Sequence, residues 1–441
     1  MSRAERWLPR LLAFTVFSFA CASSTVDLFE LVGRPLRWAC LLLLAAVAAS
    51  LARRRRPGRA LLVAAAVAGG LAAVALVSSA WSVDTGLTFG RAASLAVLFF
   101  AASAAAAAAS ARPLLGTRIL AAILLAAVVI AASGLVVMAF VYSDAVQAAT
   151  AQYGARYRGM GQNPNTMASL FAVTLPLAAW WLWRARSRRD RVLAVGGFLL
   201  LDGSIVASGS RGALLSASLG LLVLGVAAVR TPRRLAVLAV SVAALTVVNV
   251  GLAQLPNATT SSEQPAPPSR TRNAQRLLPL EGEIGRGPLD RPRPKIKRSL
   301  LGGSGRSQAW RGALEQAGER PLLGYGFGTE EKVFVDRYYY FVSGAPENSY
   351  IGTTLQLGAT GIVLLLALVG FLLVAAVRRA RAAAAERVDV GAAAAVLVAG
   401  LALAVTQSYV LSVGNVATAS VWLCGFLAVT LAPSAASRTA A

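Results

Sequence analysis

The chain has 441 residues, of which 57% are hydrophobic and only 14% are charged. Soluble domains average about 45–50% apolar and about 25% charged residues, so this composition excludes a disordered chain and is unlike that of a soluble globular protein. The net charge of +24 is better explained by basic cytoplasmic loops of a membrane protein than by nucleic-acid binding. Because the sequence contains no histidine, we expect any general base to be Asp or Glu.

Long apolar segments recur along the whole chain. A transmembrane helix needs about 20 consecutive, mostly apolar residues. Runs of about this length occur at 8–27, 36–52, 60–80, 92–111, 118–142, 166–184, 191–208, 212–229, 235–255, 349–377, 390–408 and 415–432. The sequence therefore predicts an all-α polytopic membrane protein with about twelve transmembrane helices.

Four basic clusters each follow an even-numbered apolar run. They lie at 53–59, 184–191, 230–234 and 378–387. Cytoplasmic loops are enriched in Lys and Arg, so these four segments and both termini are expected in the cytoplasm. The loops 81–91, 142–165, 208–212 and 256–348 then face the extracytoplasmic side.

This topology divides the chain into three parts. Residues 1–255 hold the first nine predicted helices, 256–348 form one large extracytoplasmic loop, and 349–441 hold the last three helices and a short cytoplasmic tail. Residues 256–300 are rich in Pro, Ser, Thr and Arg, a composition typical of disorder. The rest of the loop contains short elements: 307–317 predicts a helix, and 321–328 predicts a tight loop.

One arginine lies where charge is expensive. Arg211 joins two apolar runs without a hydrophilic spacer, at the end opposite the basic clusters, and small residues such as Ser210 surround it in the sequence. A guanidinium in such a place can extend toward lipid headgroups. It can also bind a phosphate with two parallel hydrogen bonds, which makes Arg211 a candidate for diphosphate binding.

Three further groups of polar residues lie in the predicted outer loops. They are Arg158, Asn163 and Asn165 before the sixth run; Arg306, Trp310 and Arg311 on the predicted loop helix; and Glu347, Asn348 and Tyr350 before the tenth run. Each group also has a structural interpretation. Asn165 and Asn348 suit helix N-caps, and the spacing of Arg306 and Trp310 suits a surface cation–π pair.

Together these residues predict group transfer from a diphosphate. Arginines can neutralise a departing diphosphate, and Glu347 can take the proton from an attacking sugar hydroxyl. The competing bases are Glu330, Glu331 and Asp336, which we expect on a solvated loop face, and Asp84 in the first outer loop. The outer loops contain no Asp-x-Asp pair, which favours a metal-independent route, and we expect no cofactor.

From about 153 to 361 the chain resembles the O-antigen ligase and O-antigen polymerase superfamily of bacterial envelope enzymes. The resemblance rests on six segments in matching order: 158–165, 208–213, 305–310, 321–328, 347–350 and 358–361. It implies a GT-C-like membrane fold in the bacterial plasma membrane, with the active site on the extracytoplasmic side.

The same resemblance implies the reaction and its residues. An undecaprenyl-diphosphate-linked glycan would be transferred, with inversion and without metal, to a hydroxyl of a glycan or glycolipid acceptor. The family arginines fall on Arg211 and on Arg306, with Arg311 the weaker match, and Glu347 would act as the base. Ligases of the family often carry histidine where this chain has Glu347, so a polymerase and a ligase for another acceptor both stay open.

A transporter or flippase for lipid-linked glycans is the alternative from another class. Such proteins place polar residues deep in their spans, often at broken helices. Asp202 is the one acidic candidate within the predicted spans, so the transferase interpretation is favoured.

Overall fold

A computed structural model of the chain describes residues 3–53, 57–110, 112–149, 154–253, 306–335, 344–382 and 387–431. Within these ranges most residues belong to helices, which are joined by loops and one two-stranded antiparallel sheet. The segment 256–300, predicted to be disordered, and the predicted cytoplasmic tail after 431 lie outside the described residues.

A long helix lies at each predicted apolar run. These helices are α1 (Arg3–Ala22), α2 (Asp27–Ala52), α3 (Arg59–Val77), α4 (Thr85–Ser110), α5 (Pro113–Phe140), α7 (Pro164–Arg184), α8 (Arg188–Ser208), α9 (Arg211–Ala228), α10 (Pro232–Leu252), α13 (Ser349–Ala382), α14 (Arg387–Leu403) and α15 (Thr418–Thr430). In the described part of the chain, nine helices are long and apolar enough to cross a membrane. The chain is an all-α polytopic membrane protein.

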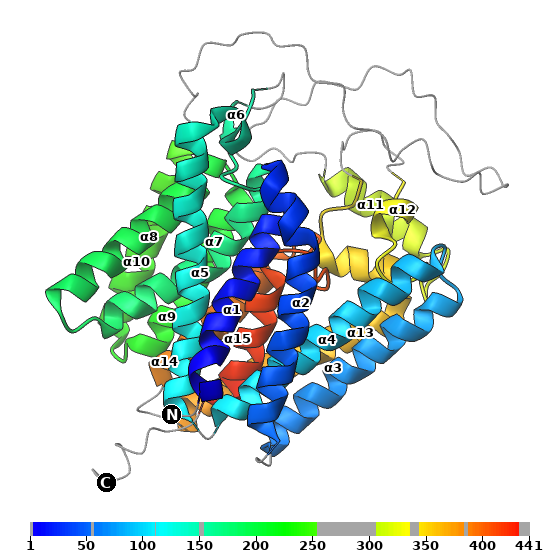
Figure 1. Ribbon diagram of the computed structural model, residues 1–441, viewed down its shortest axis with the longest axis horizontal. Helices are drawn as coiled ribbons and strands as arrows, with labels where there is room; N and C mark the ends of the chain where they lie inside the picture. Colours follow the sequence, from blue (N-terminus) through cyan, green and yellow to red (C-terminus); the bar gives the residue numbers. More distant parts are fainter. Residues whose placement is uncertain are drawn as a thin grey trace.

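Short elements fill the connections at one end of the bundle. They are η1 (Ser78–Ala80), α6 (Tyr142–Ala145), β1 (Val146–Gln147), β2 (Arg156–Tyr157), α11 (Arg306–Ala317) and α12 (Glu330–Val333). In Figure 1, α6, α11 and α12 lie at the end of the bundle opposite the beginning of α1. The helix predicted at 307–317 and the tight loop predicted at 321–328 are both confirmed.

The bundle is packed tightly inside and apolar outside. All 13 residues of α15 are buried, and Trp422 meets Phe99 of α4 edge-on with 5.1 Å between ring centroids. Six consecutive alanines in α4 (104–109) are buried, since small residues let helices approach closely. On α10, in contrast, Val240 and Val247 are about 70% exposed, as side chains that face lipid are.

The last two helices are shorter than the sequence predicts. The run 390–408 was expected to be helical throughout, but α14 ends at Leu403, and α15 begins only at Thr418 rather than 415. Residues 404–417, here called the re-entrant segment, are irregular and packed within the protein. Ser349 accounts for this conformation, because its Oγ accepts hydrogen bonds from the backbone N–H groups of Tyr409 (2.9 Å) and Val410 (3.1 Å).

A second irregularity breaks α13. Gly358 has φ 59° and ψ −156°, which is not helical, and the loop 321–326 pairs with the freed backbone. Ala359 N donates to Pro321 O at 2.7 Å, and Gly326 N donates to Gln356 O at 2.9 Å. Residues 321–328, here called the glycine-rich loop, therefore supply the hydrogen bonds that the α13 backbone lacks at this point.

We predict that Gly358→Ala destabilises the protein while Gly370→Ala does not. A Cβ at Gly358 would overlap the backbone of Leu322, and the positive φ is itself unfavourable for alanine, whereas a Cβ at Gly370 meets nothing within 4 Å. We expect a loss of about 2 kcal/mol or more at Gly358 and no loss at Gly370, measured by thermal unfolding in detergent. Equal melting temperatures for the two variants would contradict the proposed role of the break.

Candidate active site

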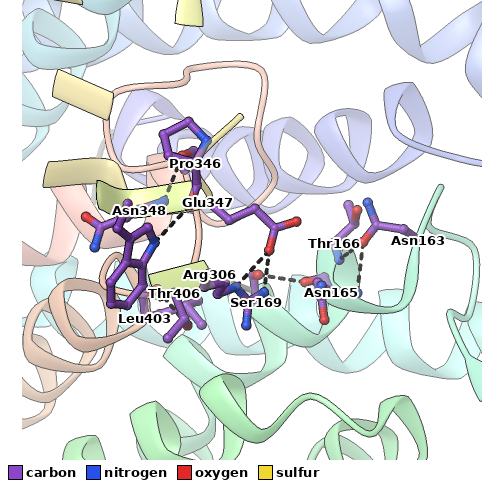
Figure 2. Close-up of polar contacts among 12 residues, drawn as sticks. Asn163, Asn165, Thr166, Ser169, Arg306, Pro346, Glu347, Asn348, Leu403 and Thr406 are labelled. Atoms are coloured by element: carbon purple, nitrogen blue, oxygen red, sulfur yellow. Dashed lines mark hydrogen bonds and ion pairs between the residues drawn. The ribbon is translucent and has the colours of Figure 1, made fainter. Parts of the chain in front are cut away.

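Arg306 and Glu347 form an ion pair at the start of α11. Arg306 Nε donates to Glu347 Oε2 at 3.1 Å and a terminal guanidinium nitrogen bonds the same oxygen, while each side chain is about 25% exposed. One turn later, Trp310 Nε1 donates to Pro346 O at 2.9 Å. Arg306 and Trp310 thus share a helix face, as predicted, and both contact the segment 346–347. Figure 2 shows the Arg306 side chain beside Glu347.

The backbone around Glu347 is held in an unusual conformation. Glu347 has φ 48°, a value that costs a non-glycine residue of order 1 kcal/mol and persists only where neighbours enforce it. Asn348 does so as the N-cap of α13, since its Oδ1 accepts from Tyr350 N (3.0 Å) and Ile351 N (3.1 Å). Asn348 N donates to Ser408 Oγ at 3.0 Å, which ties Glu347 to the re-entrant segment.

The start of α7 carries a second group of hydrogen bonds. Asn163, not Asn165, is the N-cap: its Oδ1 accepts from Asn165 N at 2.9 Å and from Thr166 N at 3.1 Å. The sequence placed the cap two residues late because Pro164 fills the first helical position, where proline needs no partner for a missing N–H. The Asn165 side chain is therefore available to Arg156, which donates to its Oδ1 at 3.1 Å.

Arg156 was not singled out from the sequence, yet it joins two parts of the site. Besides Asn165, it contacts Ser208, donating from Nε to the backbone oxygen at 2.6 Å. Ser208 ends α8, and Gly209 follows in the left-handed conformation with φ 63°. No single-residue signal distinguishes Arg156 from Arg158 in the sequence, because the difference arises only from the β1–β2 hairpin.

Arg211 is the first residue of α9, directly after the buried Ser210. The next residue, Gly212, lies against the Thr406 side chain, because a Cβ at that position would overlap Thr406 Oγ1. The start of α9 therefore packs on the re-entrant segment, which in turn contacts Asn348 through Ser408. One connected set of contacts thus links the beginnings of α7, α9 and α13. Through the Arg306–Glu347 pair it also includes α11.

Three other candidates bind their own surroundings. Arg158 Nε donates to Asp144 O at 2.9 Å, so its guanidinium holds α6. Arg311 is 74% exposed and pairs with Glu315 one turn along α11. Tyr350 donates its hydroxyl to Leu401 O at 2.9 Å. Of the arginines on α11, Arg306 is therefore the one that faces Glu347.

Glu330 was expected to be a solvated loop carboxylate, and the structure corrects this. Its Oε1 accepts from Ser408 Oγ at 2.6 Å and its Oε2 accepts from Gln356 Nε2 at 3.1 Å. Burial, partly opposed by the Ser408 hydrogen bond, raises the pKa of Glu330 from 4.5 to about 7. The glycine-rich loop causes the burial, because it folds onto the break in α13 and carries Glu330 with it.

Comparison with known proteins identifies the middle of the chain. Residues 195–366 match the family model described as O-antigen ligase. These residues belong to the O-antigen ligase family. The match confirms the resemblance seen in the sequence and gives the chain a general role in ligase- or polymerase-type glycan transfer. No curated protein matches the chain.

The O-antigen ligase region contains the three residues singled out for catalysis. It begins within α8 and ends within α13, so it includes Arg211, Arg306 and Glu347. The family match and the apolar helices indicate an integral protein of the bacterial inner membrane. Arg158 precedes the matched residues.

We predict that Glu330→Gln changes the pH dependence of stability. With the pKa of Glu330 raised from 4.5 to about 7, the folded state binds more protons than the unfolded state between these values. The contribution of Glu330 to stability therefore falls as pH rises from 4.5 to 7 and stays low above 7. Glutamine carries no charge, so the variant should gain a few degrees of melting temperature over wild type between pH 5 and pH 8.

The matched control is Glu319→Gln, an exposed glutamate one short loop away. Its melting temperature should differ from wild type by the same amount at both pH values. Glu331 and Arg91 are the charged neighbours that act on Glu330, and both are retained in each variant. A Glu330→Gln difference that does not grow with pH would contradict the assigned pKa shift.

Proposed function

We propose that this protein transfers a glycan from an undecaprenyl-diphosphate-linked donor to a hydroxyl of a glycan or glycolipid acceptor. The observation that carries the proposal is the ion pair between Arg306 and Glu347, which lies within the O-antigen ligase region and joins a phosphate-binding group to a potential base. The lipid tail of the donor would stay in the bilayer while its diphosphate reaches the end of the bundle that holds α11 and α12.

Arg211 and Arg306 would bind the donor diphosphate. A guanidinium makes two parallel hydrogen bonds to phosphate oxygens, and the positive end of the α9 dipole lies at Arg211. Two guanidinium groups would neutralise the charge that develops on the leaving diphosphate. This role for arginine supports a metal-independent reaction.

Glu347 would act as the general base once the donor is bound. In the structure its carboxylate is bound by Arg306; a diphosphate competing for that guanidinium would release it. The acceptor hydroxyl oxygen would then attack the anomeric carbon of the donor sugar from the side opposite the diphosphate. A C–O bond forms, the bond from the anomeric carbon to the diphosphate oxygen breaks, the diphosphate leaves with the electron pair, and Glu347 takes the hydroxyl proton. One such displacement inverts the anomeric configuration.

The remaining candidates would surround the donor and acceptor sugars. They are Arg158, Asn163, Asn165, Ser210, Trp310, Arg311, Asn348 and Tyr350. For several of them a contact to substrate would add to the protein hydrogen bonds described above. We further propose that α1, α14 and α15 complete twelve crossings in a GT-C-like arrangement, with 1–255, 256–348 and 349–441 as its three parts.

A transport function has less support from the described spans. Asp202 of α8 accepts from Asn249 Nδ2 of α10 at 2.9 Å and 3.1 Å, and Asp389 of α14 pairs with Arg184. Both carboxylates have partners that join neighbouring helices. Ligation and polymerisation use the same chemistry and differ in the acceptor, so both remain within the proposal.

We predict that Arg306→Ala and Arg211→Ala each lower glycan transfer by about a hundredfold or more, because each removes a charge-assisted phosphate contact. Glu347→Gln should abolish transfer but leave donor binding within a few-fold of wild type. The assay uses purified protein in nanodiscs with lipid-linked donor. Arg320→Ala is the matched control, since Arg320 lies over the Tyr325 ring on an exposed loop. Wild-type transfer rates in both arginine variants would disprove the diphosphate site.

The side of the membrane can be tested with single cysteines. Ser307 on α11 and Ser187 before α8 are exposed, whereas the native Cys21, Cys40 and Cys424 are buried and should label poorly. We predict that an impermeant maleimide added to intact cells modifies Ser307→Cys and not Ser187→Cys. The reverse labelling pattern would place the proposed site in the cytoplasm and contradict an undecaprenyl-linked donor exposed outside.

A further inference from the structure

A cavity of about 590 Å³, lined by both apolar and charged residues, lies next to the Arg306–Glu347 pair. The two sites share a boundary, because Ala345 and Ser349 flank Glu347 and also line the cavity. Its other sides come from α2, the start of α4, the glycine-rich loop with α12, and the re-entrant segment. A cavity of this size is typical of sites that enclose a small organic group.

Glu330 lies on one side of this cavity with part of its hydrogen-bonding capacity unused. Ser408 and Gln356 each donate one hydrogen bond to its carboxylate, whereas two carboxylate oxygens offer about four acceptor positions. Ser408 also accepts from the backbone N–H of Asn348. The Ser408 hydroxyl therefore links Glu330 to the segment that carries Glu347.

Arg37 lines the same cavity from α2. Its Nε is buried and has no hydrogen-bond partner among the described residues, a costly arrangement for a charged group. The guanidinium lies 4.7 Å from the centroid of the Trp38 ring, which also lines the cavity. Because the Nε is enclosed by the protein, a ligand oxygen in the cavity would bind the terminal nitrogens of this guanidinium.

The charges of the cavity select among ligand classes. Arg37 and Arg91 are balanced by Glu330 and Glu331, so a phosphate would meet carboxylates as well as arginines. A lipid tail would fit better in the apolar cavity of about 260 Å³ between α7, α8, α9 and α10. A sugar hydroxyl can both donate to Glu330 and accept from Arg37, and a sugar ring can pack on an aromatic side chain such as Trp38.

We propose that this cavity binds a sugar unit of the acceptor, with Glu330 accepting hydrogen bonds from its hydroxyls and Arg37 donating to them. The inference rests on the proposed function, because it assigns the acceptor to one side of the 345–349 segment and the donor diphosphate to the other. Glu330 and Arg37 are positioning and specificity residues here, and Glu347 keeps the proton transfer.

The test is a kinetic separation of acceptor from donor. Transfer is measured with purified full-length protein at varied acceptor, using oligosaccharide released from the envelope of the source strain, and then at varied lipid-linked donor. Glu330→Gln and Arg37→Gln should each raise the KM for acceptor about tenfold, as expected when one charge-assisted hydrogen bond is lost. The KM for donor should stay within about twofold, and Glu319→Gln should match wild type throughout.

A second variant keeps the inference testable if either substitution impairs folding. Ser412 is an exposed residue lining the cavity, so a bulky thiol reagent on Ser412→Cys should block transfer, and acceptor should slow the modification. An unchanged acceptor KM in the glutamine variants, or full transfer after modification of Ser412→Cys, would overturn the acceptor site. Absence of transfer by wild-type protein would instead overturn the proposed function itself.

Discussion

The end of the bundle that holds α11 and α12 depends on two irregular backbone segments, residues 404–417 and the loop 321–326, which both hydrogen-bond to α13. Backbone groups without partners are unaffordable at membrane depth, so non-helical segments occur there only where protein buries them. Ser349 Oγ accepts hydrogen bonds from the Tyr409 and Val410 backbone N–H groups of the re-entrant segment. Further along the same helix, the backbone at the Gly358 break forms hydrogen bonds with the loop that begins at Pro321. Because both contacts are on α13, this helix fixes the residues at its own start.

These two contacts explain why acidic side chains can lie in partly buried positions. Ser408, held by the first contact, donates to Glu330 and accepts from the N–H of Asn348. The second contact brings Gln356 and the glycine-rich loop to the other side of Glu330. Glu347 is fixed in a positive-φ conformation one residue before the N-cap of α13.

The sequence predicted the helices well and the site only in part. Apolar runs located every long helix, because lipid imposes a composition that hydropathy detects directly. The spacing of Arg306 and Trp310 predicted a shared face, and both do contact the segment at Glu347. Hydropathy failed at 404–408 and 415–417, the ends of two predicted runs that are not helical in the structure. Arg156 and Arg37 were missed and the burial of Glu330 was not predicted, because these features depend on contacts between segments distant in sequence, which no local pattern records.

The exchange of partners by Arg306 is the central claim of this account. It can be observed directly by determining the structure of the protein in nanodiscs with undecaprenyl diphosphate bound. We predict diphosphate oxygens within hydrogen-bonding distance of Arg306 and Arg211, with the Glu347 carboxylate separated from Arg306 and open to the adjacent cavity. A diphosphate bound elsewhere, with the Arg306–Glu347 ion pair intact, would contradict the account.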